Sequence, residues 1–176
     1  MVLSWILIVA MMFNPDNGGA SIYQKNIKRT TKVISKLWED QAMQVTPVEF
    51  NQTIISEHGL KTPELYNLLS DSGEAHAYMC MRSAPSKADD FTYMVIYDLD
   101  FKVKHVEVLE YRENYGGEIS SKRFLRQFQG SDSSNRLIMG EHVDGITGAT
   151  ISVKSIVHSI NVLNKQLSEL KSLGAI

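Results

Sequence analysis

The sequence predicts an α+β fold with an antiparallel-rich central sheet flanked by helices and a long amphipathic helix at the C-terminus. Two patterns support this prediction. Short segments rich in β-branched and aromatic residues lie in the middle of the chain, and apolar residues with helical spacing lie at both ends. The chain has 176 residues, of which 43% are hydrophobic and 22% charged, so one domain can bury a core of ordinary size.

Both predicted terminal helices are amphipathic. Residues 21–44 combine basic side chains with apolar ones at near-helical spacing, and Pro47 ends this helix or marks a turn. The C-terminal helix is predicted from about Ser152 to Leu173. Its apolar face carries Val153, Ile156, Val157, Ile160, Leu163, Leu167 and Leu170.

The predicted strands lie between these helices. A hairpin turn is expected over residues 98–101. Residues 53–57 are short and β-branched, which favours a strand, and Pro63 is expected to begin a short helix over residues 63–69. The main strand candidates are residues 76–82, 91–98 and 102–111, and a basic helix is expected over 120–128.

Residues 1–20 read as a signal segment. Val2 to Phe13 is an apolar run interrupted by Ser4, too short to span a bilayer, and Gly18-x-Ala20 offers a cleavage site. The protein is therefore expected to be extracytoplasmic, either periplasmic or membrane-associated. No Lys or Arg precedes the run, so the alternative is a buried helix of a cytoplasmic protein.

The composition excludes several classes of function. The net charge of −2 argues against nucleic-acid binding through bulk positive charge. The single cysteine, Cys80, cannot form an internal disulfide, a four-cysteine iron–sulfur cluster or a cysteine-rich zinc site. The five histidines form no metal-binding motif. Redox chemistry in this chain would therefore need an organic cofactor.

A stretch rich in glycine and hydroxyl side chains precedes the C-terminal helix. The unpaired N–H groups and positive dipole end of a helix attract phosphate, and small residues let the backbone approach an anion closely. The alternative is a glycine-rich turn capped by Ser152 with no ligand. The stretch is neither a Walker loop nor a GxGxxG motif.

This stretch, Asp144-x-x-Thr147-Gly148-Ala149-Thr150-x-Ser152, resembles the flavinylation motif of the FMN-binding domain family. That family includes small flavin subunits of the Na⁺-pumping NADH:quinone reductase and the Rnf complex, and free-standing exported proteins. The resemblance implies a phosphoester bond between FMN and Thr150, formed from FAD by a flavin transferase. The aspartate of the motif corresponds to Asp144.

A second stretch, Tyr111-Arg112-Glu113-Asn114-Tyr115-Gly116-Gly117-Glu118-Ile119, resembles the loop of free-standing members in which a Gly-Gly-Glu turn lies against the isoalloxazine ring. Residues 84–87 and 91–95 also resemble that subgroup. The resemblance covers roughly residues 74–170. Residues 74–176 are thus predicted to form the FMN-binding core, and residues 21–73 an N-terminal helical region of the same domain.

The expected cofactor contacts come from both stretches. Backbone N–H groups of Gly116 and Gly117 would reach the N5 and O4 edge of the ring, and Glu118 the ribityl hydroxyls. Tyr115 or Tyr111 would stack on the ring, with core packing as the equal alternative. The predicted FMN-binding residues are Thr150, Thr147, Gly148, Ala149, Ser152, Asp144, Tyr115, Gly116, Gly117 and Glu118, and no catalytic or metal-binding residue is assigned.

These features predict an FMN-binding electron-transfer protein that relays electrons between a membrane-associated donor and another redox partner protein. The alternative is a flavin-dependent reductase that acts directly on a small acceptor, and a third possibility is a binding module without flavin. A basic group, Arg112, Lys122, Arg123 and Arg126, would face phosphate, a redox partner or solvent.

Overall fold

A computed structural model describes residues 21–39 and 41–176, so the predicted signal segment lies outside the described residues. Five strands form one antiparallel sheet in the order β1-β2-β3-β4-β5, which leaves β1 and β5 at its edges. Every strand pairs with its neighbours in the chain, so short connections suffice. The strands are β1 (Gln44–Pro47), β2 (Leu65–Leu69), β3 (Ala75–Pro85), β4 (Asp90–Tyr97) and β5 (Val103–Glu110).

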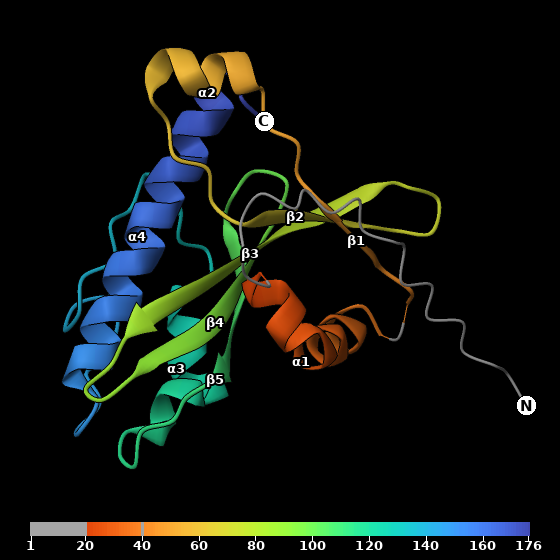
Figure 1. The fold of residues 1–176 in the computed structure, drawn as a ribbon. Helices are drawn as coiled ribbons and strands as arrows, with labels where there is room; N and C mark the ends of the chain where they lie inside the picture. The colour runs from red at the N-terminus through yellow and green to blue at the C-terminus, as the bar shows by residue number, and fades with distance from the viewer. Residues whose placement is uncertain (1–20, 40) are drawn as a thin grey trace, which may run out of the picture.

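Helices cover both faces of this sheet, which confirms the predicted α+β class (Figure 1). Helix α1 lies on one face, whereas α3 and the long helix α4 lie on the other. The α-helices are α1 (Ile22–Leu37), α2 (Gln52–His58), α3 (Lys122–Leu125) and α4 (Thr150–Ser172), and η1 (Gly117–Ser120) and η2 (Arg126–Phe128) are short 3₁₀ turns.

The period-2 pattern of β4 divides the core between the two faces. Phe91, Tyr93 and Tyr97 point toward α4, whereas Met94 and Ile96 point toward α1. The two tyrosines on the α4 side are fully buried, yet their hydroxyls donate to helix side chains. Tyr93 bonds Ser159 Oγ at 2.6 Å, and Tyr97 bonds Asn164 Oδ1 at 2.8 Å. Burial also raises the pKa of both phenols, so they stay neutral donors that fix α4 on the sheet.

The predictions for two short elements were wrong. Residues 53–57 belong to helix α2, because the Asn51 side chain accepts from the N–H groups of Thr53 and Ile54 at 3.1 and 3.3 Å, and Gly59 ends the helix at φ +60°. The stabilisation of the helix by its two caps therefore outweighs the preference of the β-branched residues for a strand.

The helix expected over residues 63–69 is instead strand β2. Strand β2 lies between β1 and β3, its residues Leu65 and Leu68 are buried, and the pairing partner of Leu68 on β3 is Ala77. A central position in a sheet overrides the weak preference of a proline-initiated segment for helix. The C-terminal helix begins at Thr150, two residues before the expected Ser152.

None of the helices in the described ranges is both long enough and apolar enough to cross a membrane.

Candidate functional site

The site begins at the N-terminus of α4. Thr150 is its first helical residue and has an exposed side chain, and Ala149 occupies the N-cap without a side-chain hydrogen bond. The N–H groups of Thr150, Ile151 and Ser152 donate no hydrogen bond within the described residues. The alternative in which Ser152 caps the helix does not hold, because Ala149 is the N-cap and Ser152, 2% exposed, lies inside the first turn. Three backbone donors at a positive dipole end are thus free for an anion.

The loop after β5 lies directly on this helix end. A Cβ added to Gly116 would stand 2.3 Å from Ala149 Cβ, so only glycine permits the contact. Gly116 also has φ +75°, which favours glycine independently. On the other side of the contact, a Cβ at Gly148 would meet Tyr115 Cβ at 3.5 Å. The structure therefore brings together the two stretches that the sequence singled out.

Tyr111 links the same two stretches through its hydroxyl. This oxygen lies 3.2 Å from Ser152 Oγ and donates to the carbonyl of Tyr115 at 3.3 Å. Its ring packs edge-on against Phe91, with 5.6 Å between the ring centroids. Core packing, one of the two alternatives for these tyrosines, therefore describes Tyr111. Tyr115 differs, since it is 78% exposed beside the helix end.

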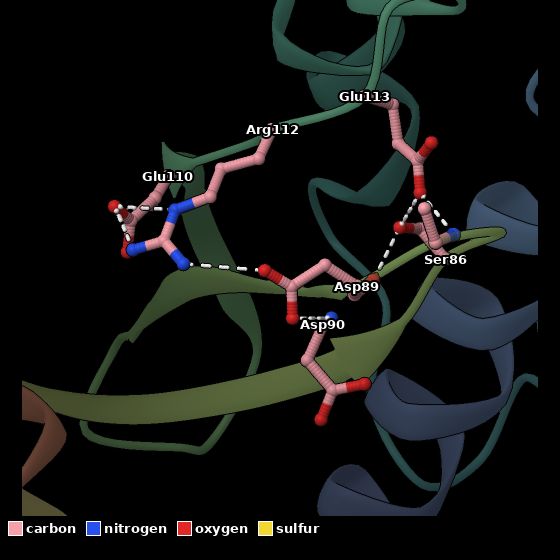
Figure 2. A network of polar contacts seen from close by, with 7 residues as sticks. Ser86, Asp89, Asp90, Glu110, Arg112 and Glu113 are labelled. Carbon is pink, nitrogen blue, oxygen red and sulfur yellow. Dashed lines mark hydrogen bonds and ion pairs between the residues drawn. The ribbon is translucent and has the colours of Figure 1, made fainter.

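A polar network holds the loop from its other side (Figure 2). One oxygen of Glu113 accepts from Ser86 Oγ and from the N–H of Ala88, the latter at 2.6 Å, both in the turn between β3 and β4. These bonds lower the pKa of Glu113, because they favour the carboxylate. The end of β3, which leads into this turn, is joined to α4, since Ser155 Oγ donates to the Pro85 carbonyl at 2.6 Å.

Arg112 belongs to that network and not to a phosphate site. Its guanidinium pairs with Glu110 at 2.8 Å and with Asp89 at 3.2 Å, and both interactions raise its pKa (Figure 2). The basic group expected from the sequence is therefore divided. Arg112 lies on the strand side of the loop, whereas Lys122 and Arg126 lie beside α1 at the edge of the sheet.

The remaining candidates lie on the surface around the helix end. Asp144, Thr147 and Glu118 have exposed side chains, and the Asp144 N–H is held by Gln127 Oε1 at 2.8 Å. Glu118 sits in the first turn of η1, directly after Gly116 and Gly117. A Cβ at Gly117 would meet no atom within 4 Å, so the backbone there is open to an approaching ligand.

Sequence reasoning gave no role to Ser86, Glu113, Gln127 or Ser155, which hold the two stretches in place. Ser86 and Glu113 lie within segments that resemble the family, but nothing local indicates that they bond each other. Their contact joins positions 27 residues apart, and that of Ser155 with Pro85 joins positions 70 apart. Strand pairing brings Ser86 and Glu113 together, and the packing of α4 on the sheet brings Ser155 to Pro85.

Glu113 makes the stability of this loop dependent on pH. A carboxyl whose pKa is lowered by folding contributes stability above its unfolded pKa, and this contribution is lost as the pH falls through the folded value. We expect the urea midpoint of wild type to fall more steeply below about pH 5 than that of Glu113→Gln, which keeps an acceptor oxygen. Glu141→Gln, at an exposed position, is the control and should follow wild type. Equal slopes for wild type and Glu113→Gln would contradict this role.

No curated protein matches the sequence significantly. Four chains of solved structures match, among them NqrC from Shewanella oneidensis, with 18% identity and a TM-score of 0.49. That match covers 62% of this chain and 61% of the NqrC chain, so this protein spans less than two thirds of that relative.

The family comparison is more direct. The family model described as FMN-binding domain matches residues 87–164, from the β3–β4 turn to the third quarter of α4. This range includes Glu113, Gly116, Ala149 and Thr150, and it confirms the resemblance found in the sequence. Residues 87–164, a little under half of the chain, are thus similar to the FMN-binding domain family.

Proposed function

We propose that this protein is an electron-transfer flavoprotein whose FMN is held at the N-terminus of α4 by a phosphoester on Thr150. The observation that carries the proposal is the joining of two family-like stretches through Gly116 and Ala149. When bound, FMN supplies the capacity to exchange one or two electrons. Everything else in the proposal concerns how this chain binds and exposes that group.

The residues at the helix end fit a phosphate ester. The Thr150 hydroxyl is exposed and faces no competing hydrogen bond within the described residues. The adjacent N–H groups of Ile151 and Ser152 would donate to phosphate oxygens, and the helix dipole favours the same charge. Ala149 and Gly148 present no bulky side chain there, and Gly148 takes φ +81°. Thr147 and Asp144 would border the phosphate from the preceding turn.

The loop after β5 fits the apolar ring. Gly117 is exposed, and the buried Gly116 packs against Ala149, which directly precedes Thr150, so the N–H groups of the two glycines would bond the polar edge of the ring. The exposed Tyr115 would cover one face of the flavin ring. This contact would explain why so large an aromatic residue as Tyr115 is 78% exposed. Glu118, one residue further along, would accept from the ribityl hydroxyls.

The position of the site supports a carrier more than a reductase. Tyr115, Gly117 and Thr150 are exposed, and neither the groove beside β5 nor the groove lined by Asp132 and Arg136 includes a residue of the two stretches. A protein partner could approach such a group closely, whereas a small acceptor would find little to hold it. We propose that the donor is membrane-associated and the acceptor a second redox protein, with a flavin transferase needed for maturation.

A covalent bond suits an exported carrier. Free FMN is scarce outside the cytoplasm, and a dissociable cofactor is lost by dilution. Attachment to Thr150 replaces that equilibrium with an intramolecular one, whose effective concentration is on the order of millimolar or higher.

Replacing Thr150 tests the attachment. When the protein is produced with a flavin transferase, its intact mass should exceed that of the chain by one FMN less one water. Thr150→Ala should lose this excess completely, because no hydroxyl remains to esterify, and Thr150→Ser should keep it. Thr62→Ala removes an exposed threonine hydroxyl outside both stretches, so this control should keep the excess. A full mass excess in Thr150→Ala, measured after denaturation, would rule out this residue.

Gly116 and Gly117 form a matched pair for the loop contact. Gly116→Ala should destabilise the flavin-free protein by about 1–3 kcal/mol, because the new Cβ overlaps Ala149 and the positive φ is strained. Gly117→Ala should change the free energy of unfolding by less than about 0.5 kcal/mol, since its Cβ meets nothing. Urea unfolding measures both. Similar losses in the two variants would show that the close approach of Gly116 does not matter.

The two functions differ in their reoxidation kinetics. We expect the reduced flavoprotein, mixed anaerobically with small quinones or other small acceptors, to reoxidise at a rate that rises linearly with acceptor concentration. Linearity is expected because a flavin held at an exposed helix end would not accumulate a bound complex with a small acceptor. Stopped-flow absorbance of the flavin measures the rate. A hyperbolic dependence that saturates below about 1 mM, within the ordinary range of KM, would instead favour the reductase.

A further inference from the structure

A groove of about 730 Å³ lies at the edge of the sheet, away from the two motif stretches. Helix α1 forms one wall, α3 and η2 form the other, and the edge strand β5 runs along the floor between them. The relation of these elements is visible in Figure 1, where β5 is the outermost strand on the side of α3. The groove does not depend on flavin binding.

The floor of the groove exposes unpaired strand edge. At the start of β5, Val103 exchanges two backbone hydrogen bonds with residues 130 and 131, and Gln129 Nε2 donates to the Lys104 carbonyl at 3.1 Å. At its end, the Arg29 guanidinium donates to the Leu109 carbonyl. Between these points, residues 105–108 have no backbone hydrogen bond to any described segment other than β4. An open edge of this kind is a template for another extended chain.

The walls of the groove are strongly basic. Lys32 and Lys36 stand on α1 at the three- to four-residue spacing that places them on one side, and Lys122 and Arg126 stand opposite. With Arg29, five cations face this space, whereas Glu107 is its one acidic residue and already contacts His105 at 3.2 Å. A chain with a net charge of −2 therefore concentrates positive charge at one place.

Apolar side chains lie between the cations. Val33, Leu37 and Leu125 line the same walls, and Leu37 is 40% exposed. An added strand would point alternate side chains toward α1 and toward α3, where a short apolar residue or a carboxylate finds a partner. A lipid headgroup would use the charges but not the free backbone groups of β5.

From these features we infer that the β5 edge binds an extended acidic segment of a partner protein by strand addition. Backbone hydrogen bonds to residues 105–108 supply the affinity, and the cations of α1 and α3 select acidic side chains. Pairing of β5 with β5 of a second copy of this chain is disfavoured, because it would place the cations of one copy against those of the other. This surface is separate from Thr150, so it would dock a partner without covering the flavin.

The test uses the full chain and a fluorescein-labelled peptide of seven residues that alternates glutamate with valine. Fluorescence anisotropy should show saturable binding below about 1 mM, and hydrogen exchange of residues 105–108 should slow when the peptide is bound. The same peptide with alternate backbone nitrogens methylated should bind at least about tenfold more weakly, because it cannot complete the ladder. A peptide with lysine in place of glutamate should not bind.

Charge reversal completes the test. Lys32→Glu with Lys122→Glu should weaken binding by about tenfold or more. Lys154→Glu with Lys165→Glu, exposed on α4, changes the net charge equally and should leave binding unchanged. The inference would be overturned if the peptide did not bind at about 1 mM, or if N-methylation left its affinity unchanged. It would also be overturned if both double variants lost affinity equally, or if self-association of the chain protected residues 105–108 from exchange. Flavin attachment is measured separately by intact mass, so its failure is distinguishable.

Discussion

The contact between Gly116 and Ala149 is the one on which the candidate flavin site depends, because it places two loops from distant parts of the chain side by side. One loop follows the edge strand β5, and the other precedes α4. At 2.3 Å, a Cβ on Gly116 would overlap Ala149 Cβ, so the approach requires that one residue lack a side chain. Small residues here serve close packing as well as access for an anion.

The rest of the domain holds that contact in position. The sheet carries one loop on β5, and the buried hydroxyls of Tyr93 and Tyr97 fix α4, which carries the other. The end of β3 bonds α4 through the Pro85 carbonyl and Ser155, and the turn that follows bonds the loop after β5 through Ser86 and Glu113. Each loop is thus attached to a rigid element and to its neighbour. Such double attachment is what a site needs when its own backbone supplies the contacts.

Charge is distributed so that the two proposed surfaces do not compete. The helix end offers backbone dipoles and neutral hydroxyls, whereas the β5 groove offers five cations around an open strand edge. An electron carrier needs one surface near the cofactor that partners can reach. A second surface that binds a partner is an advantage, because it raises the local concentration of that partner at the cofactor. The small net charge of the whole chain conceals this separation.

The sequence by itself determined the α+β class, the long C-terminal helix and the two loops, because helical periodicity, strand alternation and glycine-rich turns are local patterns. It misassigned residues 53–57 and 63–69, where the Asn51 cap and a central place in the sheet outweighed propensity. Tertiary structure alone decided that Gly116 meets Ala149, that Glu113 bonds Ser86 and that α1 and α3 enclose the β5 edge. The first two contacts join residues 33 and 27 positions apart, and strand pairing and burial determine which distant residues meet.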